Sequence, residues 1–389
     1  MEIAIVGAGP AGAWAAYTLA RRGVRVTLFD PSHPREKPCG GGITGRALEL
    51  IGGAILPRVS SIRAARFIDS RRGRSAIVPL ETRGGNDERA LEVTSRAVFD
   101  RALVTAATAA GASWVAARVT DIAVGADQVR IDTTRGAHHA AFVIGADGVN
   151  SLVRRRVASP FSRSQLSMAT GFFARGVTSD EIVLELVADP PGYIWSFPRS
   201  DHLAIGICAQ AAAGLTAAAL RARAADWIRA TRIAGTARLD TYSWPIPSLR
   251  APEFGALTLA GPRWCLVGDA AGLVDPLTRE GIHFALLSGK WAAEAITGPD
   301  ASRTYRQRVQ DEIAPELARA ARAHAAFFHP ALTRLLIEAL ESSAGIRAVM
   351  ADLIAGRQRY ATLKWRLLKT FEVGLACRAL SSLNSPPLA

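Results

Sequence analysis

The chain opens with an apolar run, a glycine-rich turn and a helix-forming stretch. Residues 3–6 are all apolar, as expected for a β-strand buried on both faces of a sheet. Residues 11–22 favour a helix, and Pro10 suits its first turn because the N–H that proline lacks has no partner there. Residues 24–29 are predicted to form the second strand, with Asp30 at its tip. The pattern predicts strand, turn, helix and strand, the start of an α/β domain.

Further apolar segments return to this pattern much later in the chain. Residues 142–145 and 264–267 are short apolar runs that predict buried strands. Residues 96–110 and 280–296 have the composition of helices, and several more helices are expected from residue 301 onward. The first domain is therefore expected to be assembled from separated parts of the sequence.

The middle of the chain has a different pattern. Between about 160 and 254, short alternating runs such as 181–186 and 203–207 predict a second domain that is rich in β-sheet. Residues 214–234 interrupt it with a predicted helix. Residues 67–80 are also strand-like, and we expect them to leave the first domain and join this sheet.

Composition places the chain among folded globular proteins. It has 389 residues, of which 49% are hydrophobic and 21% are charged, which excludes collagen-like and disordered classes. The formal net charge of +13 is carried mostly by arginine. The arginines are scattered and form no recognition-helix, zinc-finger or RNP pattern, so nucleic acid is not an expected partner. A solvated basic surface and attraction to anionic lipid or substrate both remain open.

The cysteines and the lengths of the apolar runs indicate the compartment. Four cysteines lie far apart, without metal-ligand spacing, and no signal peptide is recognised at the start. We therefore expect free thiols in the cytoplasm and no metal site. No apolar run reaches the roughly 18 residues that a membrane span needs. Any membrane contact is expected to be peripheral, at the inner face.

A glycine motif marks the first candidate site. Gly7, Gly9 and Gly12 form a G-x-G-x-x-G pattern between the first predicted strand and helix. In this context the glycines allow a tight turn, the approach of a pyrophosphate and close helix packing. Asp30, at the end of the second strand, has the position of a carboxylate that accepts hydrogen bonds from ribose hydroxyls. The motif predicts an FAD or NAD site.

A second motif distinguishes FAD from NAD. Residues 267–271 read VGDAA after a predicted strand, and Gly281 and Ile282 open the helix that follows. This pattern resembles the second FAD fingerprint of flavoprotein hydroxylases and reductases. The resemblance implies that Asp269 binds the ribityl chain and that Gly268, Gly281 and Ile282 also belong to the cofactor site. It further implies that the helix start faces the flavin, where its positive end stabilises the anionic reduced ring.

Two more segments resemble the same superfamily. Arg96 lies in a helix similar to one that supplies an arginine to FAD, although an ordinary surface arginine would have the same pattern. Asp147 lies in a segment, residues 144–151, similar to the Asp-Gly motif of these proteins. We expect Asp147 to support the pyrophosphate region rather than touch the cofactor.

At this point the sequence resembles the geranylgeranyl reductase family of FAD-dependent oxidoreductases. Residues 37–43 read KPCGGGI, which matches a loop of that family and includes Cys39, Gly40 and Gly41. Residues 192–198 read GYIWSFP and match its Tyr-x-Trp-x-Phe-Pro segment. The resemblance extends from residue 1 to about 300.

The resemblance implies an α/β fold with a Rossmann-like FAD-binding domain of the glutathione-reductase or hydroxylase type. An inserted, mainly antiparallel sheet domain would bind the substrate, and a helical region would complete the chain. The expected boundaries are an FAD domain over 1–60, 93–158 and 255–300, a sheet domain over 61–92 and 159–254, and a helical region over 301–389.

The same resemblance implies a reaction. Family members reduce carbon–carbon double bonds of prenyl chains, with hydride leaving N5 of reduced flavin and a proton coming from a nearby donor. Cys39 and Tyr193 are candidate donors, although Cys39 could equally be inert. Tyr193, Trp195 and Phe197 alternate along a strand and are expected to line an apolar substrate pocket; ordinary core packing would give the same pattern.

Several alternatives remain open. A flavin monooxygenase or halogenase would share this architecture, although no lysine corresponds to the catalytic lysine of the halogenases. A non-catalytic prenyl-binding escort protein is a third alternative, against which the intact glycine motif argues. The flavin would need an external electron donor, with NAD(P)H as one candidate. Residues 364–371 interleave cations with aromatics and leucines, which fits either a membrane-surface helix or a packed helix. The sequence does not indicate an oligomeric state.

Overall fold

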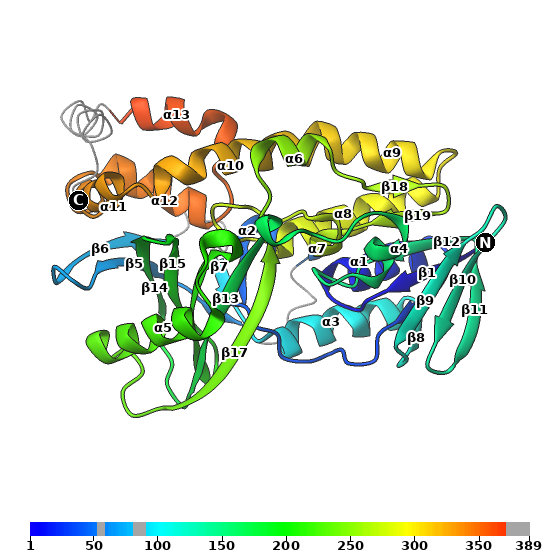
Figure 1. The fold of residues 1–389 in the computed structure, drawn as a ribbon, viewed down its shortest axis with the longest axis horizontal. Helices are drawn as coiled ribbons and strands as arrows, with labels where there is room; N and C mark the ends of the chain where they lie inside the picture. The colour runs from blue at the N-terminus through cyan, green and yellow to red at the C-terminus, as the bar shows by residue number, and fades with distance from the viewer. Residues whose placement is uncertain (53–58, 81–90, 371–389) are drawn as a thin grey trace.

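The computed structural model describes residues 1–52, 59–80 and 91–370. Two sheets and a layer of C-terminal helices make up most of the molecule (Figure 1). A six-stranded sheet carries the amino-terminal strand, and a seven-stranded sheet lies beside it. The helices that follow residue 300 extend across both parts of the molecule (Figure 1).

The six-stranded sheet has the order β18-β19-β12-β1-β2-β8. Its strands are β1 (Glu2–Val6), β2 (Arg25–Phe29), β8 (Ser113–Val115), β12 (Phe142–Gly145), β18 (Ala260–Gly261) and β19 (Trp264–Leu266). Strand β1 pairs in parallel with β2 and β12, and β12 pairs in parallel with β19. Apolar residues fill these strands because both faces are covered.

Three helices pack together beside this sheet, namely α1 (Pro10–Ala20), α3 (Arg96–Ala109) and α8 (Ile282–Ile296). A three-stranded sheet packs against the same core through Ile122, Val129 and Ile131. Its strands are β9 (Val119–Val124), β10 (Val129–Thr133) and β11 (Gly136–Ala140).

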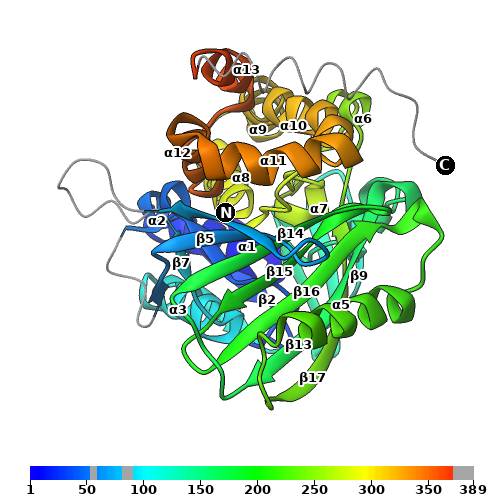
Figure 2. The ribbon, with the colours of Figure 1, turned by 90° about the vertical axis from the view of Figure 1, so that its left-hand side faces the viewer.

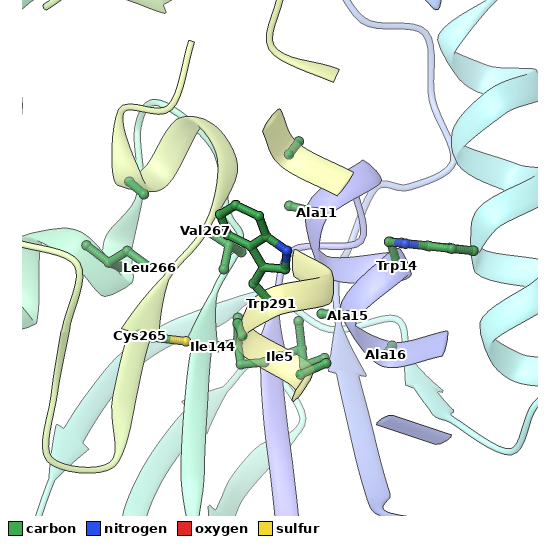
Figure 3. Close-up of a cluster of buried hydrophobic side chains, with 14 of the residues drawn as sticks. Ile5, Ala11, Trp14, Ala15, Ala16, Ile144, Cys265, Leu266, Val267 and Trp291 are labelled. Carbon is green, nitrogen blue, oxygen red and sulfur yellow. The ribbon is translucent and has the colours of Figure 1, made fainter. Parts of the chain in front are cut away.

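Helices α1 and α8 pack closely together in this core. A Cβ placed on Gly289 of α8 would lie 2.3 Å from the backbone oxygen of Ala11, so the two backbones approach directly. Trp291 of α8 and Ala15 of α1 belong to the same cluster of buried side chains, above the strand residue Ile5 (Figure 3). Small residues along α1 make this approach possible.

The seven-stranded sheet has the order β17-β13-β16-β15-β14-β5-β6 and is antiparallel except for the pair β14 and β5. Its strands are β5 (Ala64–Asp69), β6 (Arg74–Pro79), β13 (Leu166–Arg175), β14 (Glu181–Ala188), β15 (Pro191–Pro198), β16 (His202–Gln210) and β17 (Arg238–Pro247). All seven lie within 61–92 and 159–254, and on this basis we propose these ranges as one structural unit. Helix α5 (Ala217–Thr231) packs on one face of it.

Shorter elements connect the two sheets. Three strands pair in the order β3-β7-β4, and small helices adjoin the six-stranded sheet and its loops. They are β3 (Gly42–Thr44), β4 (Ser60–Ser61), β7 (Leu91–Val93), α2 (Gly45–Ile51), α4 (Leu152–Val157), α6 (Ala251–Gly255) and α7 (Gly268–Ala271). The 3₁₀ turns are Arg163–Gln165 and Ala211–Ala213.

The C-terminal helices form a layer in which α9 packs on β18 of the six-stranded sheet and later helices lie over the seven-stranded sheet (Figures 1 and 2). They are α9 (Ala301–Arg308), α10 (Ala314–Phe327), α11 (Pro330–Ser342), α12 (Ala344–Ile354) and α13 (Tyr360–Leu368), with a π-helical turn over Val309–Ile313. Helices α11 and α12 pack on β6. Across the described ranges, no helix combines the length and apolarity needed to cross a membrane.

The fold expected from the sequence is confirmed, namely a Rossmann-like α/β part, a mainly antiparallel sheet and C-terminal helices. The strand-like segment 67–80 is part of a hairpin, β5 and β6, because residues 70–73 form a turn. The hairpin joins the seven-stranded sheet, as expected.

Candidate active site

The glycine turn after β1 has no room for side chains at two positions. Gly7 has a φ of +102°, and a Cβ there would lie 2.4 Å from the carbonyl oxygen of Ala146. A Cβ on Gly12 would lie 1.9 Å from the oxygen of Gly7. Gly9 is different, because the nearest atom to a Cβ there would be Lys37 Nζ, 3.7 Å away. The open backbone at Gly9 faces a cavity, as a pyrophosphate site requires.

The two motifs expected to bind FAD lie side by side in the structure. A Cβ on Gly268 would lie 3.2 Å from the Cβ of Ala11, at the start of α1. The backbone N–H of Gly268 donates to Ser288 Oγ of α8 over 3.0 Å. Because β1, β12 and β19 are parallel neighbours, the segments that follow them meet at one edge of the sheet.

A cavity of about 280 Å³ begins at this edge and extends to the seven-stranded sheet. Its polar part includes Gly9, Lys37, Arg96 and Asp269, and its wall also includes the start of α8 at Gly281. Ile282, the first residue of that helix, lines it as well. The structure therefore brings most of the expected cofactor-binding residues to one cavity.

Asp269 is a carboxylate without a hydrogen-bond partner among the described residues, although the hydrogen bonds of its neighbours are well defined. Burial raises the pKa of Asp269, and the nearby cations Lys37 and Arg96 oppose this rise. A half-buried carboxylate that faces a cavity without a donor is costly unless a ligand supplies hydroxyl groups. The ribityl chain of a flavin has such hydroxyls.

Asp30 has a different environment from the one expected. Its Oδ2 accepts the N–H of Ala8 (3.0 Å) and contacts His33 Nδ1 (2.8 Å), and its Oδ1 accepts the backbone N–H groups of Ser32 and His33. Burial would raise the pKa of Asp30, but His33 and these donors hold it well below its ordinary value of 3.8. Asp30 thus fixes the glycine turn to the loop after β2, and its contact with ribose stays a prediction.

Arg96 lines the cavity and forms a buried pair with Asp100. Its Nε and Nη2 donate to the two carboxylate oxygens, each over 2.9 Å. The same carboxylate lies 3.1 Å from His33 Nε2, which continues the network to Asp30. Burial would lower the pKa of Arg96, but Asp100 outweighs it and raises the pKa. The guanidinium is thereby held charged beside the cavity.

Lys37 is a cation that the sequence analysis did not single out. Its Nζ lies in front of Gly9, and burial followed by the nearby Arg96 lowers its pKa, whereas Asp100 and Asp269 oppose this. A lysine at this place would neutralise a pyrophosphate. Lys37 opens the KPCGGGI segment, but only the folded loop brings its Nζ to the glycine turn.

Asp147 lies outside the cavity and organises the segment behind the glycine turn. Its carboxylate accepts the Ser151 hydroxyl and the backbone N–H groups of Leu152 (2.6 Å) and Val153 (3.2 Å), at the start of α4. Its neighbours Ala146 and Gly148 line the cavity. This placement favours a supporting role, which stays a prediction.

The loop that carries Cys39, Gly40 and Gly41 presses against the seven-stranded sheet. A Cβ on Gly40 would lie 3.1 Å from the Phe197 ring, and one on Gly41, whose φ is +83°, would lie 2.2 Å from the oxygen of Thr94. These glycines let the backbone reach the cavity wall. The three loop residues line the cavity.

A partly buried ion pair holds this loop. Arg199, at the end of β15, is fully buried and pairs with Glu36 while its Nη2 donates to the carbonyl of Cys39 over 2.5 Å. Glu36 also accepts the Ser95 hydroxyl and the N–H of Arg96 at the start of α3. Burial would raise the pKa of Glu36, but Arg199 and these donors lower it. The pair therefore joins the loop, α3 and the sheet.

Tyr193, Trp195 and Phe197 all line the cavity from one face of β15. Cys208 of β16 pairs with Tyr193 across the strands and lines the cavity too, which the sequence did not indicate. A Cβ on Gly206 would lie 2.3 Å from the Trp195 ring, so this glycine lets the indole lie across β16. The alternation expected from the sequence thus produces an aromatic wall.

The two candidate proton donors differ in their environment. The Tyr193 hydroxyl donates to the carbonyl of Thr278 over 2.7 Å, and burial raises its pKa well above 10. The sulfur of Cys39 accepts the N–H of Gly41 over 3.3 Å. Tyr193 therefore keeps its proton at neutral pH, and both groups border the cavity.

Comparisons with known proteins now identify the family. The sequence matches the family described as FAD binding domain over residues 1–286. It is 30% identical to the menaquinone reductase of Mycolicibacterium smegmatis over 76% of each chain. It is also 30% identical to the chloroplastic geranylgeranyl diphosphate reductase of Oryza sativa subsp. japonica, over 78% of this chain and 68% of that protein. The chain belongs to the geranylgeranyl reductase family of FAD-dependent oxidoreductases.

Another relative of this chain is the digeranylgeranylglycerophospholipid reductase of Methanothrix thermoacetophila. The two are 29% identical over 82% of this chain and 85% of that protein. A crystal structure of a geranylgeranyl bacteriochlorophyll reductase-like protein from Thermoplasma acidophilum superposes with a TM-score of 0.76, at 21% identity, over 95% of this chain and 98% of that one. A flavin-dependent brominase gives a TM-score of 0.71 at 20% identity, over 95% and 99% of the two chains. These structures share the fold.

The residues that line the polar part of the cavity are suited to bind FAD, the cofactor of this family. The open backbone at Gly9, beside the positive end of α1, suits a pyrophosphate, and the unpartnered Asp269 suits the ribityl hydroxyls. The loop at Gly40 and Gly41 offers flat backbone for an aromatic ring. Assignment of each residue to an atom of FAD stays a prediction.

Replacement of Asp269 tests the cofactor site. Asp269→Ala is expected to purify with much less bound FAD, because it removes the only described carboxylate in the cavity wall that lacks a donor and is placed for the ribityl chain. The measurement is the ratio of visible flavin absorbance to protein absorbance. Asp127→Ala, at an exposed turn, is the matched control and should keep the wild-type ratio. Full FAD occupancy in Asp269→Ala would refute the assignment.

Replacement of Arg199 tests the ion pair that holds the Cys39 loop. Arg199→Met should lower the free energy of unfolding by about 3 kcal/mol at neutral pH, because it leaves Glu36 partly buried and unpaired. The control Arg238→Met breaks an exposed pair with Asp240. It should change the free energy of unfolding by no more than about 0.5 kcal/mol. Urea unfolding of both variants measures the difference.

The difference in free energy of unfolding between the wild type and Arg199→Met is expected to depend on pH in a defined direction. The folded pKa of Glu36 lies below its ordinary value of 4.5, so its contribution to stability is present above pH 4.5 and is lost as the pH falls through the folded value. The gap between wild type and Arg199→Met should therefore narrow in acid. If the difference in free energy of unfolding stays constant or widens as the pH falls, Glu36 is not the partner through which Arg199 stabilises the fold.

Proposed function

We propose that this protein reduces carbon–carbon double bonds of an isoprenoid or similarly apolar substrate. The observation that carries the proposal is the continuity of one cavity from the polar residues at the FAD motifs to an apolar end. Side chains of β14, α10 and α12 line that end, for example Leu184, Phe327 and Leu353. A flexible hydrocarbon chain is the class of ligand that such a lining accommodates.

The names of the relatives support this substrate class. Proteins named as reductases of geranylgeranyl diphosphate and of digeranylgeranylglycerophospholipid are 30% and 29% identical to this chain. Both names specify geranylgeranyl groups. We therefore propose that a prenyl chain of this kind binds in the cavity described above.

FAD supplies hydride transfer from N5 of its reduced form when it is bound. The residues of this protein then have three tasks. The aromatic wall at Trp195 and Phe197 orients an alkene and excludes water from it. The backbone of the Gly40 loop lines the cavity next to this wall, in contact with Phe197. Tyr193 or Cys39 holds the proton that completes the reduction, at the hydroxyl or the thiol.

Oxygenation or halogenation is the competing function. It is considered because a flavin-dependent brominase has the same fold. Sequence relatives named as reductases favour reduction. A non-catalytic escort function is disfavoured, because the glycine turn and Asp269 retain the geometry of a cofactor site.

The reaction itself gives the most direct test. We expect the FAD-loaded protein, reduced with dithionite under anaerobic conditions, to convert geranylgeraniol to products that gain two hydrogens for each reduced double bond, as measured by mass spectrometry. Dithionite makes the test independent of the natural donor, for which NAD(P)H is the candidate. Tyr193→Phe should retain FAD and lose most of the rate if its hydroxyl supplies the proton.

A matched incubation with oxygen separates the two functions. Incorporation of an oxygen atom into the product, with no gain of hydrogens under anaerobic conditions, would contradict the proposal and favour a monooxygenase. Binding of the alkene without any product in either incubation would favour the escort function.

We further propose peripheral contact with an anionic membrane through α13. Trp365 is 67% exposed and Leu368 54% exposed, contrary to a helix that packs its apolar side chains on its own domain. Exposed lysines, Lys364 and Lys369, flank them, which matches an anionic surface. Helix α13 packs on α10 and α12, the helices that line the apolar end of the cavity.

Co-sedimentation with liposomes tests this contact. Vesicles that contain anionic phosphatidylglycerol should pull down the wild type at low salt and less of it at high salt. Trp365→Glu combined with Leu368→Glu should abolish the binding. Trp114→Glu, at the edge strand β8, is the control because Trp114 is 40% exposed elsewhere on the molecule. No binding of the wild type at low salt would contradict the proposal.

A further inference from the structure

Arg279 has an unusual backbone conformation in the wall of the cavity. Its φ is +61°, in the left-handed region that a long side chain rarely adopts. It lies in the loop between α7 and α8, two residues before Gly281, and it lines the cavity. Such a conformation persists where the surrounding structure holds it, and it often marks a functional position.

The loop around Arg279 is fixed from both sides. The N–H of Arg279 donates to the carbonyl of Asp275, and the N–H of Asp275 donates to the carbonyl of Glu280, each over 2.9 Å. The carbonyl of Thr278 accepts the Tyr193 hydroxyl of the aromatic wall over 2.7 Å. The backbone of Arg279 is therefore held in place by the loop and by the cavity wall.

The guanidinium of Arg279 lacks a carboxylate partner. It donates to the hydroxyl of Ser248, and none of the carboxylates in the described ranges forms an ion pair with it. The adjacent Glu280 is paired with Arg46 instead. The carboxylate of Asp275 accepts two backbone N–H groups and a tyrosine hydroxyl from α13.

The titratable groups that face Arg279 are neutral at physiological pH. Burial raises the pKa of Tyr193 and of Cys208, and burial together with Arg279 lowers the pKa of His324 to about 4. The Nε2 atom of His324 is buried and has no hydrogen-bond partner within the described part of the chain. A positive charge thus borders the cavity without a compensating negative charge, which is costly unless a ligand provides one.

We propose that Arg279 binds the phosphate group of a prenyl phosphate ester whose hydrocarbon chain lies in the apolar part of the cavity. The inference rests on the proposed function and deepens it by naming the head group. Arginine suits this role because its planar guanidinium donates two parallel hydrogen bonds to phosphate oxygens. The side chain then distinguishes an acidic prenyl substrate from a neutral one with the same chain.

Ligand binding to the FAD-loaded protein tests the proposal without requiring turnover. The probes are geranylgeranyl diphosphate, digeranylgeranylglycerol phosphate and geranylgeraniol, which represent a free phosphate ester, a lipid head group and a neutral chain. Each is titrated by calorimetry and by the perturbation of the flavin spectrum. The wild type is expected to bind at least one phosphate ester about tenfold or more tightly than the alcohol, and the tighter of the two esters identifies the source of the phosphate.

Arg279→Gly is the decisive variant. Glycine adopts a positive φ without strain, so the variant should fold and retain FAD at wild-type stoichiometry. It should bind the phosphate esters no more tightly than the alcohol, and Arg279→Lys should restore part of the preference. Arg232→Gly is the matched control, since Arg232 has a φ of 55° and is exposed at the end of α5. It should leave the preference unchanged.

The outcomes separate this inference from the proposed function. Equal binding of ester and alcohol by the wild type, or a preference that survives in Arg279→Gly, overturns the role of Arg279 while the reduction of apolar alkenes still stands. Binding of none of the three probes overturns both. Loss of the preference in Arg279→Gly alone, with FAD retained, supports the inference.

Discussion

The close approach of α8 to α1 is the contact on which the site depends. Gly289 brings the two backbones together, and Ser288 beside it receives the N–H of Gly268. This places the bend after β19 against Ala11 at the start of α1. Two segments more than 250 residues apart thereby share one edge of a parallel sheet, and a dinucleotide can contact both.

The second constraint is the attachment of the Cys39 loop to the other sheet. The pair between Glu36 and Arg199 crosses from the nucleotide-binding part to the end of β15, whose aromatic residues form a cavity wall. The C-terminal helices close the far end of the same cavity. A flavin ring beside Gly40 would therefore face an apolar chamber, which is the arrangement that reduction of a hydrocarbon chain needs.

The sequence predicted the parts of this site that depend on local rules. The glycine turn, the alternation of Tyr193, Trp195 and Phe197, and the bend at Gly268 all follow from backbone geometry within a few residues. Long-range packing decided the rest. Arg199 carries no motif, and only the fold shows that it supports the loop.

The sequence also did not indicate which charged side chains have a partner of opposite charge in the fold. Asp30 has the expected position after β2, yet the folded loop supplies its carboxylate with protein donors. Lys37 and Arg279 become informative only when their neighbours are known, because a charge without a partner is a property of the folded cavity. The exposure of α13 likewise followed from how it packs on α10 and α12.

A crystal structure of the FAD-loaded protein tests the central claim most directly. The account predicts one FAD per chain, with its pyrophosphate at Gly9, its ribityl chain at Asp269 and its ring beside Gly40. A cofactor that contacts the glycine turn while Asp269 faces only solvent or protein would contradict the account.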